Sequence, residues 1–152
     1  LVLVPIELVI ALKGSAWIVP PLALAAAWRD GQFTPIAAIP AVLAYLGAVV
    51  AGTIVTPLAL PWLPTRSFAV KGAIVGALWS LLFLSATGWR GGAAAATLLL
   101  ISAVSAFLAL NFTGSTPYTS ISGVKREMRL SMPVMAAGLV AGIGFWVAAA
   151  LR

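Results

Sequence analysis

The stretch GAAAATLLLISAVSAFLALNF, from Gly92 to Phe112, carries no charged residue from its first position to its last. A helix needs about 20 mostly apolar residues to cross the roughly 30 Å of hydrocarbon in a bilayer. Backbone polar groups must be satisfied within the segment there, which favours a helix over any open structure. This stretch therefore predicts a transmembrane helix.

Similar apolar runs lie on both sides of it. Of the whole chain, 62% is hydrophobic and 8% is charged, whereas soluble domains average about 25% charged residues. We therefore predict an all-α membrane protein, a single transmembrane domain over residues 1–152. Its bundle of about five helices is expected at residues 14–28, 34–55, 72–87, 92–112 and 130–151. The first run is short, so that helix either tilts little or includes the turn before Gly14.

The basic residues orient this bundle, because Lys and Arg are retained mainly on the cytoplasmic side. One side receives Lys13, Arg66, Lys71, Lys125, Arg126 and Arg129, and the other receives Arg29, Arg90 and Arg152. This asymmetry predicts a multi-pass protein of a prokaryotic inner membrane with its N-terminus in the cytoplasm. It also accounts for the net charge of +6 without a nucleic-acid partner.

The chain lacks the residues on which most enzyme sites depend. It contains no Cys and no His, so it offers no thiolate or imidazole for metal binding or nucleophilic catalysis. Its three acidic residues, Glu7, Asp30 and Glu127, are widely separated. We therefore expect no catalytic residue, and no metal or cofactor bound by this chain alone.

Small residues within the spans predict how the helices pack. Gly72 and Gly76, and likewise Gly138 and Gly142, stand four apart, a spacing that lets helix backbones approach closely. The serines of the spans are expected to bond back to their own helix backbone; they are Ser80, Ser85, Ser102 and Ser105. Few polar groups remain for a substrate pathway, although a small transporter or channel subunit stays open as an alternative.

Two longer connections are predicted on the cytoplasmic side, at 56–71 and 113–127. Three prolines in the first, Pro57, Pro61 and Pro64, argue against a continuous helix and favour a stiff segment at the interface. The second is rich in Gly, Ser and Thr and ends in a basic cluster. Together they would form a docking surface; its candidate residues are Asn111, Thr113, Tyr118, Lys125, Arg126, Arg66 and Lys71. Alternatively, the cations simply lie among anionic headgroups.

Three stretches carry a resemblance to a known family. LVLVPIEL at the start, PWLPTRSFAVKG in the middle and NFTGSTPYTSISGVKREM before the last span are similar to the C-terminal membrane domain of the mercury-methylating corrinoid protein (HgcA type). This family is related to the corrinoid iron–sulfur protein of the acetyl-CoA pathway. The resemblance implies an N-terminal corrinoid-binding domain in cis that transfers a methyl group to mercuric ion. It also implies a partner ferredoxin with two [4Fe-4S] clusters.

The family's cap-helix cysteine has no counterpart here, because this chain contains no Cys. The start at Leu1 favours a piece of a longer protein over a standalone chain. The resemblance thus implies a membrane anchor and docking scaffold of a corrinoid methyltransferase. Besides the transporter, a membrane enzyme acting on a lipid or isoprenoid stays open, with Glu7 and Glu127 as its only acidic pair on the cytoplasmic face.

Overall fold

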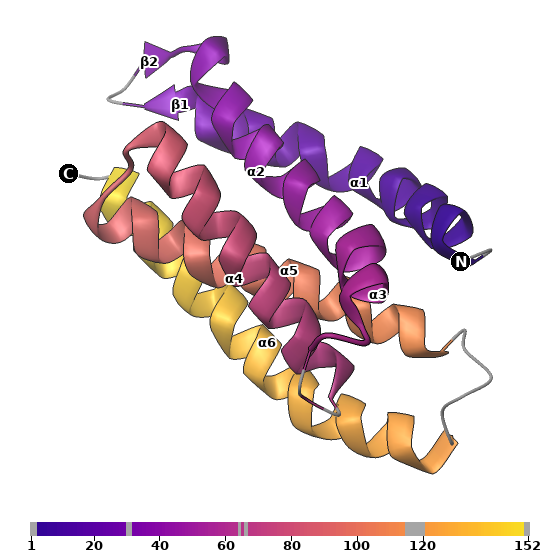
Figure 1. Cartoon of the computed structure of the whole chain (residues 1–152). Helices are drawn as coiled ribbons and strands as arrows, with labels where there is room; N and C mark the ends of the chain where they lie inside the picture. The colour runs from indigo at the N-terminus through magenta and orange to yellow at the C-terminus, as the bar shows by residue number, and fades with distance from the viewer. Residues whose placement is uncertain (1–2, 30–31, 64, 66, 115–120, 151–152) are drawn as a thin grey trace.

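The computed structural model describes residues 3–29, 32–63, 65, 67–114 and 121–150, which form an almost wholly helical bundle (Figure 1). Its elements are α1 (Leu3–Ala27), β1 (Trp28–Arg29), β2 (Gln32–Phe33), η1 (Pro35–Ala37), α2 (Ala38–Val50), η2 (Ala51–Val55), α3 (Thr56–Ala59), α4 (Phe68–Thr87), α5 (Gly91–Gly114) and α6 (Ile121–Ala150). Within the described ranges, five helical units are long and apolar enough to cross a membrane. The predicted all-α bundle of five spans is confirmed.

Three of the predicted helix starts come too late in the sequence. Helix α4 begins at Phe68 and not at Gly72, and the alternative that the first helix includes the turn before Gly14 is confirmed. Helix α1 begins at Leu3 and not at Gly14, and α6 begins at Ile121 and not at Leu130. The apolar-run criterion stops at charged residues, but Glu, Lys and Arg are good helix formers. Their long side chains also reach water while the helix continues. The first span is therefore a helix of full crossing length.

The second span is irregular. Helix α2 passes into the π-helical segment η2 and then into α3, which continues through Pro57 to Ala59. The prediction that the prolines of 56–71 exclude a continuous helix is confirmed, because α3 ends at Ala59 and α4 begins only at Phe68, but Pro57 itself lies inside α3. A proline ring collides with the carbonyl four residues earlier in an ordinary helix. The wider π-turn just before Pro57 relieves that crowding, and Thr56 Oγ1 donates to Ala51 O at 2.8 Å inside it.

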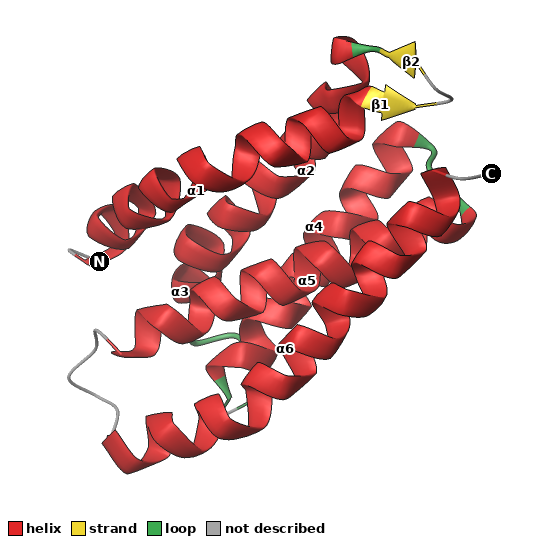
Figure 2. Cartoon of the chain, turned by 180° about the vertical axis from the view of Figure 1, so that it is seen from behind, coloured by secondary structure: helices red, strands yellow, loops and turns green. Residues whose placement is uncertain are grey.

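Consecutive spans alternate in direction, so the two ends of the bundle differ (Figures 1 and 2). The start of α1, the end of α3, the end of α5 and the start of α6 share one end, which we call the basic end. The β1–β2 pair, with Trp28 opposite Phe33, lies at the other end with the α4–α5 turn and the C-terminus. The basic end is the one to which the sequence assigns six cations, but the assignment is wrong for Lys13, which lies in the middle of α1. The cytoplasmic orientation of the basic end stays a prediction.

Helix α5 is the centre of the bundle, and α4 and α6 pack along it. A Cβ on Gly72 would lie 2.5 Å from the Cβ of Ala109, and one on Gly76 would lie 2.7 Å from the Cβ of Ser105. On α6, a Cβ on Gly142 would lie 2.7 Å from Leu100 Cγ. These contacts confirm the predicted glycine packing, which is loosest at Gly138, where a Cβ would meet Ala103 at 3.8 Å.

The span hydroxyls follow the predicted pattern in part. Ser80 donates to Ala77 O at 2.7 Å, and Ser85 donates to Leu82 O at 2.7 Å. Ser105 does not follow it, because its Oγ is buried and makes no hydrogen bond with any described residue. Its Cβ lies against Gly76 at the α4–α5 contact.

Candidate functional site

Glu127, in the first turns of α6, ties the two predicted loops together at the basic end. Its Oε1 accepts a hydrogen bond from Ser67 Oγ at 2.8 Å and another from the backbone N–H of Ala69 at 2.9 Å. Ser67 is the N-cap of α4, and its Oγ in turn accepts from the N–H of Val70 at 3.3 Å. Two of the unpaired N–H groups at the start of α4 are thereby satisfied.

The same contact is favourable electrostatically. A carboxylate near the first turn of a helix interacts well with the positive end of the helix dipole. Ala69 is itself buried among Ala106, Leu110 and Met135, which joins α4, α5 and α6 directly beneath the polar contact. Glu127 is thus a structural link between α6 and the start of α4.

Lys71 was predicted to belong to the docking surface, but it is buried, with only 9% of its surface exposed. Its Nζ donates to the carbonyl of Leu60 at 3.0 Å and lies 5.7 Å from the centre of the Phe68 ring. Leu60 is the C-cap of α3, where unpaired carbonyls favour a cation. This lysine holds the turn after α3 against α4 and offers little charge to a partner.

The other predicted docking residues divide into two groups. Asn111, Lys125 and Arg126 are exposed at the basic end. Thr113 belongs to the last turn of α5, but its side chain lies outside the described residues, as do Tyr118 and Arg66 altogether. The described part of the predicted surface is therefore small and basic.

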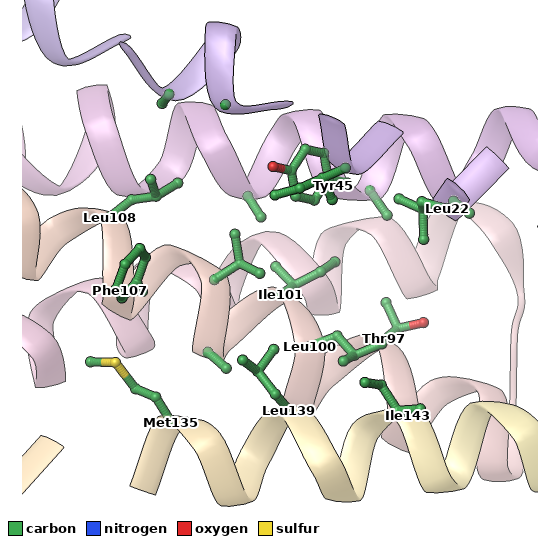
Figure 3. A pocket seen from close by; sticks show the side chains of 18 of the residues that line it. Leu22, Tyr45, Thr97, Leu100, Ile101, Phe107, Leu108, Met135, Leu139 and Ile143 are labelled. Atoms are coloured by element: carbon green, nitrogen blue, oxygen red, sulfur yellow. The ribbon is translucent and has the colours of Figure 1, made fainter. Parts of the chain in front are cut away.

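A long groove of about 870 Å³ runs beside α5, between the α1–α2 pair and α6. Figure 3 shows Tyr45 and Leu22 on one wall, and Met135, Leu139 and Ile143 on the opposite wall. Leu100, Ile101 and Phe107 of α5 form the floor between them. The lining is mainly hydrocarbon, and sequence analysis did not identify this groove.

The hydroxyl groups of Thr53, Thr97 and Tyr45, which line the groove, already have partners. Thr53 donates to Val49 O at 2.7 Å and Thr97 to Ala93 O at 2.8 Å. The Tyr45 hydroxyl lies 3.1 Å from Ser15 Oγ, which itself donates to Ala11 O. At the basic end the lining becomes polar, with Glu7 on α1 and Asn111 on α5. A hydrated route for an ion or small solute would require polar groups along the middle of the groove.

Sequence signals existed for some of these features. Ser67 stands immediately before an apolar run, which is a typical N-cap position. The groove-lining residues of α1 and α6 recur every three or four positions, which marks one face of each helix. Nothing in the sequence, however, indicates that those two faces confront each other across α5.

Comparison with protein-family models, with curated protein sequences and with solved structures finds no match to this chain.

Proposed function

We propose that this chain is the membrane anchor and docking scaffold of a corrinoid-dependent methyltransferase that converts mercuric ion to methylmercury. The proposal joins the resemblance of three sequence stretches to the arrangement of those stretches in the bundle. In it, the corrinoid-binding domain is attached in cis and a ferredoxin with two [4Fe-4S] clusters is the partner. Cobalt and iron chemistry belong to those two components, and this chain positions them at the inner membrane of a prokaryote.

One observation carries the proposal. PWLPTRSFAVKG and NFTGSTPYTSISGVKREM touch through Ser67 and Glu127, which are 60 positions apart. Residues 3–8 of the third stretch, LVLVPIEL, form the first turns of α1 at the same basic end (Figure 1). A passive anchor needs only apolar helices, whereas a docking scaffold needs a defined surface assembled from separate segments. The convergence of all three stretches favours the scaffold.

Exposed cations supply the attraction. Lys125 and Arg126 are exposed next to Glu127, whose charge is engaged with the start of α4. Positive charge at the rim of a contact raises the association rate with an acidic surface such as that of a ferredoxin. The effect is screened by salt over roughly 10 Å at 0.1 M ionic strength.

The test is a pull-down of this chain in detergent against the corrinoid domain and the two-cluster ferredoxin, scored by the cobalt and iron retained. The Lys125→Ala/Arg126→Ala variant is expected to retain less iron at low salt, with the difference shrinking as salt rises. Arg90→Ala is the control, because Arg90 is also exposed but lies at the opposite end. Absence of cobalt and iron from wild-type pull-downs at every salt concentration would reject the docking scaffold.

A further inference from the structure

One face of α6 continues from the groove into the basic end. The residues that line the groove recur at alternating steps of four and three; they are Met132, Ala136, Leu139, Ile143 and Trp146. The same spacing, extended toward the start of the helix, reaches Arg129 and then Lys125. Both residues are exposed. Since this spacing keeps side chains on one face of a helix, the apolar wall ends in two cations.

The facing wall on α1 has a matching length. Its lining residues run from Glu7 through Ala11, Gly14 and Ile18 to Leu22. At a rise of 1.5 Å per residue, that wall is about 22 Å long. One leaflet supplies about 15 Å of hydrocarbon, half of the bilayer core. The groove is therefore longer than one leaflet is thick. It can hold the full length of an extended acyl chain from the leaflet at the basic end.

The groove has the polarity that such a molecule requires. Most of its lining is hydrocarbon, the lining Thr53 and Thr97 hydroxyls are bonded within their own helices, and Glu7 and Asn111 lie at the basic end. Its volume of about 870 Å³ falls in the range typical of small-molecule sites, about 300–1,000 Å³. A chain-shaped small molecule with a polar head satisfies both properties.

We propose that this groove binds one acyl chain of an anionic phospholipid, whose phosphate lies against Arg129 and Lys125. Arg and Lys at the membrane surface favour anionic headgroups, and a guanidinium can hold a phosphate through two parallel hydrogen bonds. Glu7 brings a carboxylate to the opposite wall. The phosphate therefore lies on the α6 wall. Lipid binding shares Lys125 with the proposed partner docking, and the two are separated by Gly14→Leu, which changes the groove but not the cations of the basic end.

The groove can be filled without disturbing the helices. Gly14 lines the groove, and a Cβ placed on it meets no atom within 4 Å. Gly14→Leu therefore puts a side chain into the groove. Gly144→Leu is the matched control. A Cβ on Gly144 also meets no atom within 4 Å, but Gly144 lies on α6 outside the groove lining.

The experiment is native mass spectrometry of this chain after reconstitution with phosphatidylglycerol, phosphatidylethanolamine or phosphatidylcholine carrying identical acyl chains. Wild type and Gly144→Leu are expected to retain one phosphatidylglycerol under detergent conditions that strip the other two lipids. Gly14→Leu is expected to lose it. Lys125→Ala/Arg129→Ala should lower retention of phosphatidylglycerol about thirtyfold, as expected for the loss of two surface cations.

Equal retention of phosphatidylglycerol by Gly14→Leu and Gly144→Leu would overturn the groove as the site. Equal retention of phosphatidylglycerol and phosphatidylcholine by wild type would overturn the headgroup assignment. A second measurement does not depend on whether a variant folds. Phosphatidylglycerol with a photoreactive acyl chain is crosslinked to the wild type. Crosslinks at groove residues such as Leu139 are expected, and crosslinks confined to the exposed Val134 and Val140 would contradict the proposal.

Discussion

Glu127 Oε1 lies 2.8 Å from Ser67 Oγ, and this contact joins the start of α6 to the start of α4. The same oxygen accepts the N–H of Ala69 at 2.9 Å. Hydrogen bonds to a charged group contribute about 1.5–3 kcal/mol and a helix N-cap contributes about 1 kcal/mol. A single carboxylate thus stabilises both the helix start and the junction between two remote segments.

Glu127→Ala is expected to lower the free energy of unfolding in mixed micelles by about 1–3 kcal/mol, because Ala69 N–H loses its acceptor. Glu127→Gln keeps an oxygen acceptor and should lose less. Ser67→Ala in the Glu127→Ala background should cost less than Ser67→Ala in the wild type, since the two residues are coupled. Strictly additive effects would show that the contact contributes nothing.

Gly76→Ala is expected to destabilise the α4–α5 contact by about 1–3 kcal/mol, the usual cost of overpacking. Its new Cβ would lie 2.7 Å from the Cβ of Ser105 and 3.0 Å from the carbonyl oxygen of Ile101. Gly138→Ala is the control, because its Cβ would meet Ala103 at an ordinary 3.8 Å. The same unfolding assay compares them, and equal stabilities would argue against close α4–α5 packing.

Lys71→Met should loosen the turn after α3, because the Leu60 carbonyl loses its donor at 3.0 Å. We expect faster proteolytic cleavage within residues 60–67, measured in detergent by mass spectrometry of the fragments. Lys125→Met removes an exposed charge at the same end and should leave that rate unchanged. Unaltered cleavage in Lys71→Met would mean that its ammonium does not hold the turn.

Ser105→Ala is expected to leave stability unchanged or to raise it by up to about 1 kcal/mol, because an unpaired buried hydroxyl is costly. Among the described residues its Oγ has no hydrogen-bond partner. Ser80→Ala is the comparison, since Ser80 Oγ donates to Ala77 O at 2.7 Å. A loss of stability in Ser105→Ala, measured by the same unfolding titration, would reveal a partner for this hydroxyl.

Much of the fold was predictable because its signal is local. Hydrocarbon runs place the spans, and small residues at Gly72 and Gly76 mark a close helix contact. The helix starts at Leu3 and Ile121 were missed, because charged residues interrupt the apolar pattern without interrupting the helix. The π-turn before Pro57 was missed as well. It makes room for the proline ring next to the backbone, and a hydropathy pattern contains no information about that contact.

The candidate site was predictable only in its composition. Sequence analysis selected Lys125, Arg126 and Lys71 as one class of exposed cation, but Lys71 is buried against the Leu60 carbonyl. Whether a lysine such as Lys71 is buried depends on which helix end lies beside it. The packing of segments that are remote in sequence decides which helix end that is. The role of Glu127 was missed for the same reason, because its partners lie at Ser67 and Ala69.

The sequence by itself determined that this chain is a bundle of five membrane-spanning helices, since the cost of burying unpaired backbone groups in hydrocarbon leaves an apolar chain few alternatives. It also determined which residues carry charge, but not that Lys13 lies inside the first span. Only the tertiary structure decided that Glu127 caps α4 and that the lining faces of α1 and α6 confront each other across α5. Such contacts depend on how helices pack side by side, which periodicity along a single helix does not specify.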